Sequence, residues 1–520
     1  MATAQRMIRN LYRDSVSLMQ LSEKIQHMPE ISQASAIMAS ENNISLLVES
    51  GLLKAGIAPS PNDLLIVVEG NNADSAAAAL DAVEGLLMKR ADDADSQDVQ
   101  SLAPRSIQMS LEKMPDANLA LISTPGDYAA AEALKAMHLG LHVMMFSDNI
   151  SHEDEIMLKH YSDKHALLFM GPDCGTAILN GIPLGFANVV RRGNIGVVAA
   201  SGTGLQQVTS LIDRWGGGIS QALGTGGHDL SAEIGGITMK QGIKALSDDP
   251  STKIIVLISK PPSPAVMENV LLEAEKAGKP VVINFIGADM QSITGEMLHG
   301  VPTLEAAASA AVLLARDEPV GSVGTDLPQQ LVKDAETAAK TFKPGQKYVR
   351  GLFSGGTFCF ETLHLLGQLL GPVYSNIPLR PEWKLENVWQ SQAHTAIDLG
   401  DDLFTKGRPH PMIDFRLRNE RLLQEAGDPE TAVILLDIVL GYGSNMDPAA
   451  EIVPAIQGAQ AIARNNARGL VFIASVCGTE GDPQNLALQE EALKNAGVYL
   501  AESNAQAALM AAAVVKNIKG

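Results

Sequence analysis

The stretch NIGVVAASGTG, residues 194–204, decides the fold, because an apolar run ends there in a glycine-rich turn that opens a helix-like segment. Residues 347–357, KYVRGLFSGGT, repeat this pattern. A turn of this kind presents unpaired backbone N–H groups and the positive end of a helix dipole to its ligand. We therefore predict two copies of one strand–turn–helix unit that binds a phosphate or a carboxylate.

The segments that follow the two turns also correspond to each other. The first copy continues with GTGGHDL (224–230), KIIVLISKPP (253–262) and GKPVVINFIG (278–287). The second copy continues with IDLGDDL (397–403), TAVILLDIVLGYG (431–443) and ARGLVFIASVCGT (467–479). A strand, an SG turn, a Gly-Asp turn and two further strands thus recur in one order, which predicts an internal duplication. We expect residues 317–346 to join the two copies.

Length and composition indicate a soluble α/β protein with roughly three to four domains. The chain has 520 residues, of which 46% are hydrophobic and 4% aromatic, and its net charge of −20 argues against a nucleic-acid partner. Its cysteines, Cys174, Cys359 and Cys477, have neither metal-ligand nor disulfide spacing. The N-terminus is too polar for a signal peptide and no apolar run is long enough for a membrane span, so we expect a cytoplasmic protein with no metal site and no membrane partner.

The part before the first SG turn contains two further patterns. Residues 1–105 predict a small α/β domain that ends in a polar linker, residues 90–105. Its expected elements are a helix at 15–28, a strand at 33–38, a helix at 43–53, a strand at 64–69 and a helix at 73–89. From residue 117 onward, strands at 119–125, 142–147 and 166–176 alternate with helices at 127–137 and 152–164. This βαβαβ pattern predicts a doubly wound parallel sheet, in which ligands bind at the carboxyl ends of the strands.

With these landmarks in place, the chain resembles the FdrA family, whose members are related to succinyl-CoA synthetase and other acyl-CoA synthetases. The resemblance covers nearly the whole chain and is carried by RDSVSLM, MPDANLALIS, VMMFSDN, MGPDCGT, FANV, GNIGV, ASGTG, DLGDDL and GRPHPMID. It implies a multidomain α/β fold. Residues 106–191 would form a Rossmann-like domain of the CoA-binding type, and residues 192–320 and 345–520 would form two flavodoxin-like domains of the ligase type.

The family resemblance also implies a reaction. It is the oxamate carbamoyltransferase reaction of allantoin and purine catabolism, in which oxalurate and phosphate give oxamate and carbamoyl phosphate. Phosphate would then be held between the two helix N-termini, with phosphate or carbamoyl phosphate as the ligand and no certain cofactor. We expect small anionic substrates, partner enzyme subunits and a homo-oligomer.

Two other functions stay open. One is a nucleoside-diphosphate-forming acyl-CoA synthetase similar to succinate–CoA ligase, for which CoA and a nucleotide would be ligands. The sequence departs from that enzyme, because it has no GHAG tetrapeptide to supply a phosphohistidine and because Lys260 stands where the synthetase has the supporting acidic residue. The other is a noncatalytic scaffold or anion-sensing subunit.

The residues nominated for the site fall into three groups. The candidates for phosphate binding are Ser201, Gly202, Thr203, Gly204, Ser354, Gly355, Gly356 and Thr357. The candidates for catalysis are Lys260, His228, Arg408 and His410. The candidates for substrate binding are Gly226, Gly227, Asp229, Asp398, Asp401, Asp402, Asp173 and Cys174.

Each group also has a purely structural interpretation. Ser and Thr at SG turns cap helices without any ligand. Residues 226–229 and the Asp398, Asp401 and Asp402 cluster can be turns with capping carboxylates, although the cluster could equally bind a metal or a cationic group. GRPHPMID can be a plain rigid turn, since its two prolines fix the backbone. Cys174 lacks any sign of a paired base and can be a packing residue.

Overall fold

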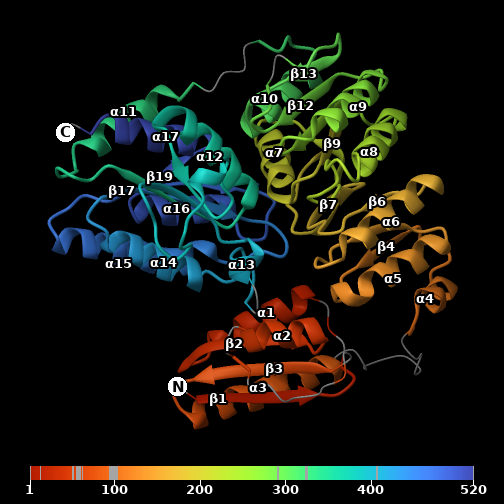
Figure 1. The fold of residues 1–520 in the computed structure, drawn as a ribbon, viewed down its shortest axis with the longest axis horizontal. Coiled ribbons are helices and arrows are strands. Elements are labelled where there is room, and N and C mark those ends of the chain that lie inside the picture. The colour runs from red at the N-terminus through yellow and green to blue at the C-terminus, as the bar shows by residue number, and fades with distance from the viewer. Residues whose placement is uncertain are drawn as a thin grey trace. The chain divides into compact units, whose positions relative to one another are not determined.

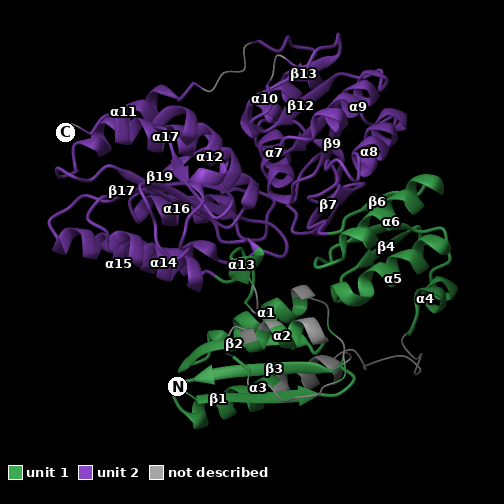
Figure 2. Ribbon diagram, viewed as in Figure 1, with its two compact units in different colours: residues 1–172, 402–414 green, residues 173–401, 415–520 purple. Residues whose placement is uncertain are grey.

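The structure is a computed structural model that describes residues 2–11, 13, 15–49, 52–53, 60, 63–92, 104–289, 292–321, 326–405 and 408–518. The chain divides into two compact units, which Figure 2 colours separately. Unit 1 comprises residues 1–172 and 402–414, and unit 2 comprises residues 173–401 and 415–520. Two sheets lie in the part of unit 1 that is described and two in that of unit 2. The four predicted domain boundaries stay predictions.

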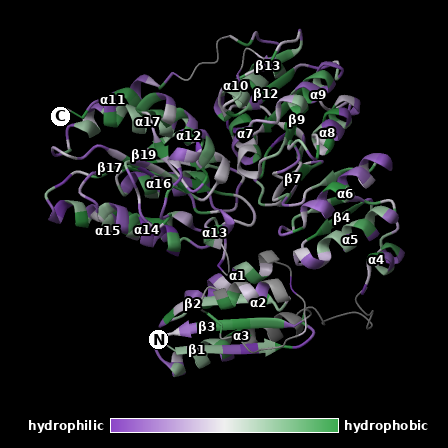
Figure 3. Ribbon diagram, in the orientation of Figure 1, coloured by the Kyte–Doolittle hydropathy of each residue, from purple (hydrophilic) through white to green (hydrophobic). Residues whose placement is uncertain are grey.

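The first sheet of unit 1 is antiparallel, with the strand order β1-β3-β2. Its elements are β1 (Ala2–Ile8), α1 (Ser15–Gln26), β2 (Ile31–Met38), α2 (Glu41–Glu49), β3 (Leu64–Gly70) and α3 (Ala73–Asp92). The central strand β3 is apolar along most of its length (Figure 3) and its residues are almost all buried. We predicted the other elements to within a few residues but missed β1. In this edge strand Met7 is exposed while the charged Arg6 lies at a half-buried position, so the sequence lacks a clear alternation of apolar and polar residues.

The second sheet of unit 1 is parallel, with the order β4-β5-β6, and confirms the βαβαβ pattern. Its elements are α4 (Ile107–Lys113), β4 (Leu119–Ile122), α5 (Gly126–His138), β5 (His142–Met145), α6 (His152–Lys164) and β6 (Phe169–Met170). The strand expected at 166–176 is wrong in length, because β6 ends at Met170. Gly171 and Asp173 then take left-handed backbone conformations, with φ of 124° and 53°, and Pro172 between them has no N–H to donate to a sheet.

The first sheet of unit 2 has seven strands in the order β13-β12-β11-β9-β10-β7-β8. Its strands are β7 (Thr176–Leu179), β8 (Ile182–Gly185), β9 (Arg192–Ala199), β10 (Ile219–Gly224), β11 (Ile254–Ser259), β12 (Val281–Phe285) and β13 (Leu298–Gly300). Its helices are α7 (Gly202–Arg214), α8 (Ile237–Asp248), α9 (Pro264–Glu275) and α10 (Leu304–Ala315). The hairpin β7–β8 joins this sheet by antiparallel pairing with β10, although we had assigned its residues to the preceding domain.

The second sheet of unit 2 has six strands in the order β15-β16-β14-β17-β18-β19. Its strands are β14 (Tyr348–Phe353), β15 (Val373–Tyr374), β16 (His394–Asp398), β17 (Thr431–Val439), β18 (Val471–Cys477) and β19 (Val498–Ala501). The helical elements of this region are α11 (Gln329–Ala339), α12 (Gly356–Leu370), η2 (Pro381–Trp383), α14 (Arg416–Gly427), α15 (Pro448–Asn465), α16 (Leu486–Asn495) and α17 (Asn504–Lys516). The short helix α13 (Asp402–Thr405) belongs to unit 1.

The two sheets of unit 2 confirm the predicted duplication. Strands β10-β9-β11-β12-β13 and strands β16-β14-β17-β18-β19 have the same order and are parallel throughout. Numbered along each copy, this order is 2-1-3-4-5, the flavodoxin-like arrangement. The joining segment 317–346 is more than a linker, because it contains α11, whose apolar face packs on α17. Among the described residues, no helix is long and apolar enough to cross a membrane.

Candidate functional site

The two SG turns lie side by side in unit 2. Ser201 caps α7 by accepting the N–H of Gly204 at 2.9 Å, and its hydroxyl oxygen lies 2.6 Å from that of Thr357 in the first turn of α12. Helices α7 and α12 pack against each other (Figure 1). A methyl group on Gly355 would stand only 2.9 Å from Cγ2 of Thr203, so the backbone of the second turn lies close to the Thr203 side chain of the first. Two helix N-termini therefore meet at one place, where their dipoles favour an anion.

Lys260 brings a cation to the same region. It follows β11, which lies next to β9 in the sheet, and β9 leads into the first SG turn. In a flavodoxin-like sheet this position is the switch point at which ligands bind. The Lys260 side chain is exposed, and its ammonium lies 5.3 Å from the ring centre of Phe360, which belongs to α12. Lys260 thus lies between the two copies, close to the first turn of α12.

The second SG turn already holds a carboxylate that belongs to the protein. Asp437, on β17, accepts the N–H groups of Ser354 and Gly355 and the hydroxyl of Ser354, each at 2.8 Å. Its other partner is Arg418, whose guanidinium donates to it at 3.0 Å, and neither side chain of this ion pair is exposed. This arrangement differs from the expectation that Ser354 and Gly355 bind phosphate, because the three donors are satisfied internally. Of the four residues nominated in this turn, Gly356 and Thr357 keep the place beside Ser201.

Asp398 lies against the first turn of α12. It ends β16, the neighbour of β14, and a methyl group on Gly356 would stand 2.5 Å from its Oδ2 atom. Oδ1 accepts the N–H of Gly400 at 2.9 Å. Burial raises the pKa of Asp398 to about 7, while the charge of Lys260 and the Gly400 hydrogen bond act in the opposite direction. The structure thus places a carboxyl that titrates near neutrality beside the paired turns.

Residues 226–229 follow β10 at the same edge of the first sheet. Both carboxylate oxygens of Asp229 accept backbone N–H groups, from Thr238 at 3.0 Å and from Met239 at 2.8 Å. This buried carboxylate therefore caps the start of α8, which is the structural alternative for that residue. Gly226 has a φ of 86°, and Gly227 and His228 are exposed.

Asp173 and Cys174 begin unit 2. The Cys174 thiol is buried and donates to the carbonyl oxygens of Thr176 and Gly224, at 3.6 and 3.5 Å. Thr176 in turn lies beside the first SG turn, since a methyl group on Gly202 would stand 3.3 Å from its hydroxyl oxygen. Cys174 is thus close to the paired turns in the fold, as a packed rather than an open side chain.

Three nominated residues belong to the other unit. Asp402, Arg408 and His410 lie in the segment 402–414 of unit 1, whereas Asp398 and Asp401 lie in unit 2. His410 accepts the N–H of Met412 at its Nδ1 atom, at 3.2 Å, as expected for a rigid turn. Arg408 is exposed. Roles for these three residues stay predictions.

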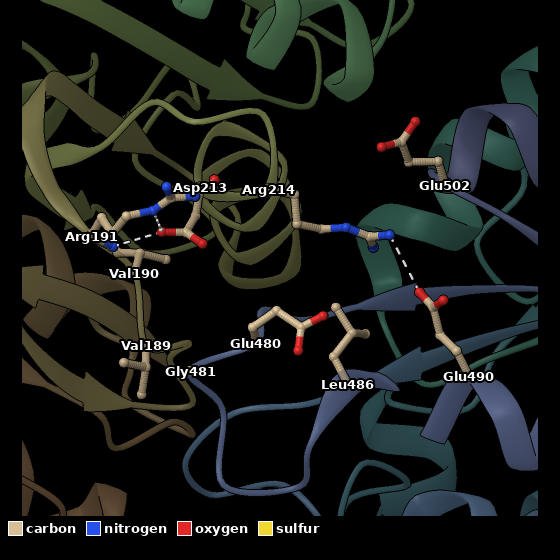
Figure 4. A pocket seen from close by; sticks show the side chains of 10 residues that line it. All are labelled: Val189, Val190, Arg191, Asp213, Arg214, Glu480, Gly481, Leu486, Glu490 and Glu502. Atoms are coloured by element: carbon tan, nitrogen blue, oxygen red, sulfur yellow. Dashed lines mark hydrogen bonds and ion pairs between the residues drawn. The ribbon is translucent and has the colours of Figure 1, made fainter. Parts of the chain in front are cut away.

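A cavity of about 650 Å³ lies elsewhere in unit 2 (Figure 4). It is lined by Val189, Val190, Arg191, Asp213, Arg214, Glu480, Gly481, Leu486, Glu490 and Glu502. Its arginines are paired, Arg191 with Asp213 at 2.9 Å and Arg214 with Glu490 at 3.3 Å. None of the residues nominated from the sequence lines it.

Sequence reasoning missed the Asp437–Arg418 pair. One signal was present, because Asp437 is the only charged residue in the otherwise apolar run TAVILLDIVLGYG. A carboxylate inside a buried strand needs a partner. Nothing in the sequence, however, identified Arg418 or the second SG turn as that partner.

Comparison with known proteins identifies the family. YahF of Escherichia coli, an uncharacterized protein, is 43% identical over 503 residues, which cover 96% of each chain. The chain belongs to the succinyl-CoA ligase-like family that includes YahF. Three domain families match: AllF, heavy metal-associated domain (residues 1–104), CoA binding domain (190–287) and CoA-ligase (352–514). These matches confirm a multidomain α/β fold with CoA-binding and CoA-ligase domains. The CoA binding domain match covers the range that we predicted as the first ligase-type domain, and not residues 106–191.

More distant relatives match only in part. The succinate–CoA ligase α subunit of Aquifex aeolicus is 29% identical over 154 residues, which are 28% of this chain and 49% of the subunit. The chain thus spans about half the length of that relative. The structure of PH0766 from Pyrococcus horikoshii aligns with 82% of this chain and 90% of its own at 15% identity, with a TM-score of 0.34.

The N-terminal family name raises the question of a heavy metal. Soft metals are bound mainly by cysteine thiolates, with histidine as the next common ligand. Residues 1–104 contain no cysteine and one histidine, His27. Within the described residues, no group of three or more His, Cys, Asp or Glu side chains could hold a metal ion. The donor set of this domain therefore does not match a thiolate metal site.

Proposed function

We propose that this chain is the subunit of an oxamate carbamoyltransferase in which phosphate binds between the N-termini of α7 and α12. The observation that carries the proposal is the 2.6 Å contact between the hydroxyl oxygens of Ser201 and Thr357, which brings the two SG turns to one place. The AllF-type N-terminal domain supports the assignment to allantoin catabolism. Reaction, substrate and partner subunits rest on the family resemblance.

The chemistry uses charge that is already in position. Donors on Ser201, Thr203 and Thr357 and the two helix dipoles would hold phosphate oxygens, and Lys260 would offset the negative charge of the attacking phosphate and of the tetrahedral oxyanion. Fixed dipoles and a single cation of this kind stabilise a transition state because they need no reorganisation when charge develops. The Asp437 carboxylate has a different role, since it fixes the shape of the second turn.

A charge reversal at Lys260 tests the proposal. The complex purified through the full-length chain should release carbamoyl phosphate from oxalurate and phosphate, and Lys260→Glu should reduce that release by at least about a hundredfold. Lys244→Glu is the matched control, because Lys244 is an exposed lysine on α8 away from the turns. Equal activity of the two variants would reject the site, and a wild-type complex without this activity would reject the reaction.

An acyl-CoA synthetase activity is the second candidate. The match of the CoA binding domain family to residues 190–287 favours it, and that range includes the first SG turn. The backbone N–H groups of a glycine-rich turn at a helix N-terminus can bind the diphosphate of CoA as well as free phosphate. Formation of an acyl-CoA from a carboxylic acid, CoA and a nucleoside triphosphate, together with phosphate covalently bound to a histidine, would support this activity over carbamoyl transfer.

A further inference from the structure

The strongest unexplained feature of unit 2 is the carboxyl of Asp398. It is 8% exposed, and among the described residues its carboxyl accepts a hydrogen bond from the Gly400 N–H at Oδ1. Most buried carboxylates in proteins are ion-paired or fully hydrogen-bonded. Asp437 illustrates that rule in the same sheet, with backbone, hydroxyl and guanidinium donors around it. Asp398 is therefore held differently from an ordinary structural carboxylate.

The surroundings of Asp398 place its Oδ2 atom at the paired turns. Its backbone is fixed by Asn376, whose side chain accepts the Asp398 N–H at 3.0 Å and donates to the Asp398 carbonyl oxygen at 3.1 Å. The carboxyl lies against the backbone of Gly356 at the start of α12, because a Cβ atom at that position would stand 2.5 Å from Oδ2. Thr357, the next residue, contacts Ser201. Only a glycine at position 356 allows this approach.

We propose that Asp398 is a catalytic residue that carries the proton from phosphate to the departing oxamate nitrogen. The inference rests on the proposed function and adds the proton transfer that the reaction needs. An amide nitrogen leaves as a stable group only if it is protonated as the C–N bond breaks, and the hydroxyls of Ser201 and Thr357 are not acids that can supply that proton near neutral pH.

The step balances in atoms and charge. A phosphate oxygen attacks the carbamoyl carbon of oxalurate and forms a C–O bond. The C–N bond then breaks, its electron pair stays on nitrogen, and protonated Asp398 donates its proton there to give oxamate. The resulting carboxylate takes the proton that the attacking phosphate carried, which leaves carbamoyl phosphate and restores the acid. In the reverse direction the ionised carboxylate takes the proton from oxamate.

Several charged and titratable groups around Asp398 determine its proton affinity. Burial raises its pKa to about 7; Asp401 in the following loop and Asp437 on β17 act in the same direction, while Lys260 after β11 opposes them. The Cys359 thiol on α12 also interacts with it, but burial raises the pKa of that thiol well above its usual range. A group that both gives and takes a proton in each turnover works best when its pKa lies near the working pH.

A sulfate titration tests the position of Asp398 without relying on turnover. The charge of sulfate does not change between about pH 6 and about pH 8. Ionisation of Asp398 over the same range adds a negative charge beside the bound anion. The wild-type chain should bind sulfate at least about tenfold more weakly at the higher pH, and Asp398→Asn should bind with one affinity throughout. Glu361→Gln is the control, because Glu361 is a second buried carboxyl whose pKa is raised to about 7, mainly by burial.

Turnover of the complex tests the proton transfer itself. Phosphorolysis of oxalurate should slow as pH rises above about 7 and the reverse reaction should slow below it. Asp398→Asn should lower kcat by about 10²- to 10⁴-fold and remove both dependences, while Asp398→Glu should restore part of the rate. A pH-independent sulfate affinity in wild type, or Asp398→Asn turnover with the wild-type pH profile, would overturn the inference. If sulfate binding depends on Asp398 but the complex forms no carbamoyl phosphate, the proposed function is overturned, and the proton transfer by Asp398 is overturned with it.

Discussion

The buried pair of Asp437 and Arg418 gives the sharpest prediction for stability. Asp437→Ala removes the acceptor for three donors of the second SG turn and leaves the Arg418 guanidinium buried without its counter-charge, since both side chains are wholly buried. Removing one partner of a buried ion pair costs about 3–5 kcal/mol. We expect the free energy of local opening of β14 and the second SG turn to fall by that amount.

Native-state hydrogen exchange measures this free energy locally, which matters in a chain of several domains. The amides of Ser354 and Gly355 report directly, because both donate to Asp437. Glu430→Ala is the control, since the Lys347–Glu430 pair is about half exposed and such pairs contribute roughly 0–1 kcal/mol. If Asp437→Ala cost no more than this control, the reasoning about the second turn would be refuted. The double variant Arg418→Met/Asp437→Ala should lose less than Asp437→Ala, because no unpaired charge stays buried.

Two further predictions concern the site and the interface between the copies. Gly356→Ala should weaken sulfate binding, measured by calorimetry, far more than Gly202→Ala. The new methyl group would stand 2.5 Å from Asp398 Oδ2 in the first variant and 3.3 Å from Thr176 Oγ1 in the second. Equal sulfate affinities of the two variants would contradict the placement of Asp398. The free energy of unfolding should fall as pH rises from about 4.5 through about 7, because burial raises the pKa of Glu361 to about 7 and the folded state favours its neutral form. The loss is on the order of 3 kcal/mol. Glu361→Gln should flatten the dependence of the urea midpoint on pH.

The fold of unit 2 was largely predictable because its signals are local. Each SG turn follows an apolar strand and opens a helix, and this order reappears in the β9–α7 and β14–α12 units. Fully buried parallel strands read as continuous apolar runs, which is how β11, β17 and β18 were predicted. The prediction failed where that signal is weak, at the edge strand β1 and after Met170, where proline ends the strand.

The sequence by itself determined the duplication, the two helix N-termini and Lys260 at the end of a strand. Only the tertiary structure decided how these parts are used. It placed Ser201 against Thr357, filled the second turn with Asp437 and set Asp398 against Gly356. The physical reason is that strand, turn and helix depend on residues close together in the chain. The partner of a buried charge, by contrast, depends on how segments far apart in sequence pack, and burial then determines whether a carboxyl there is ion-paired or titrates near neutral pH.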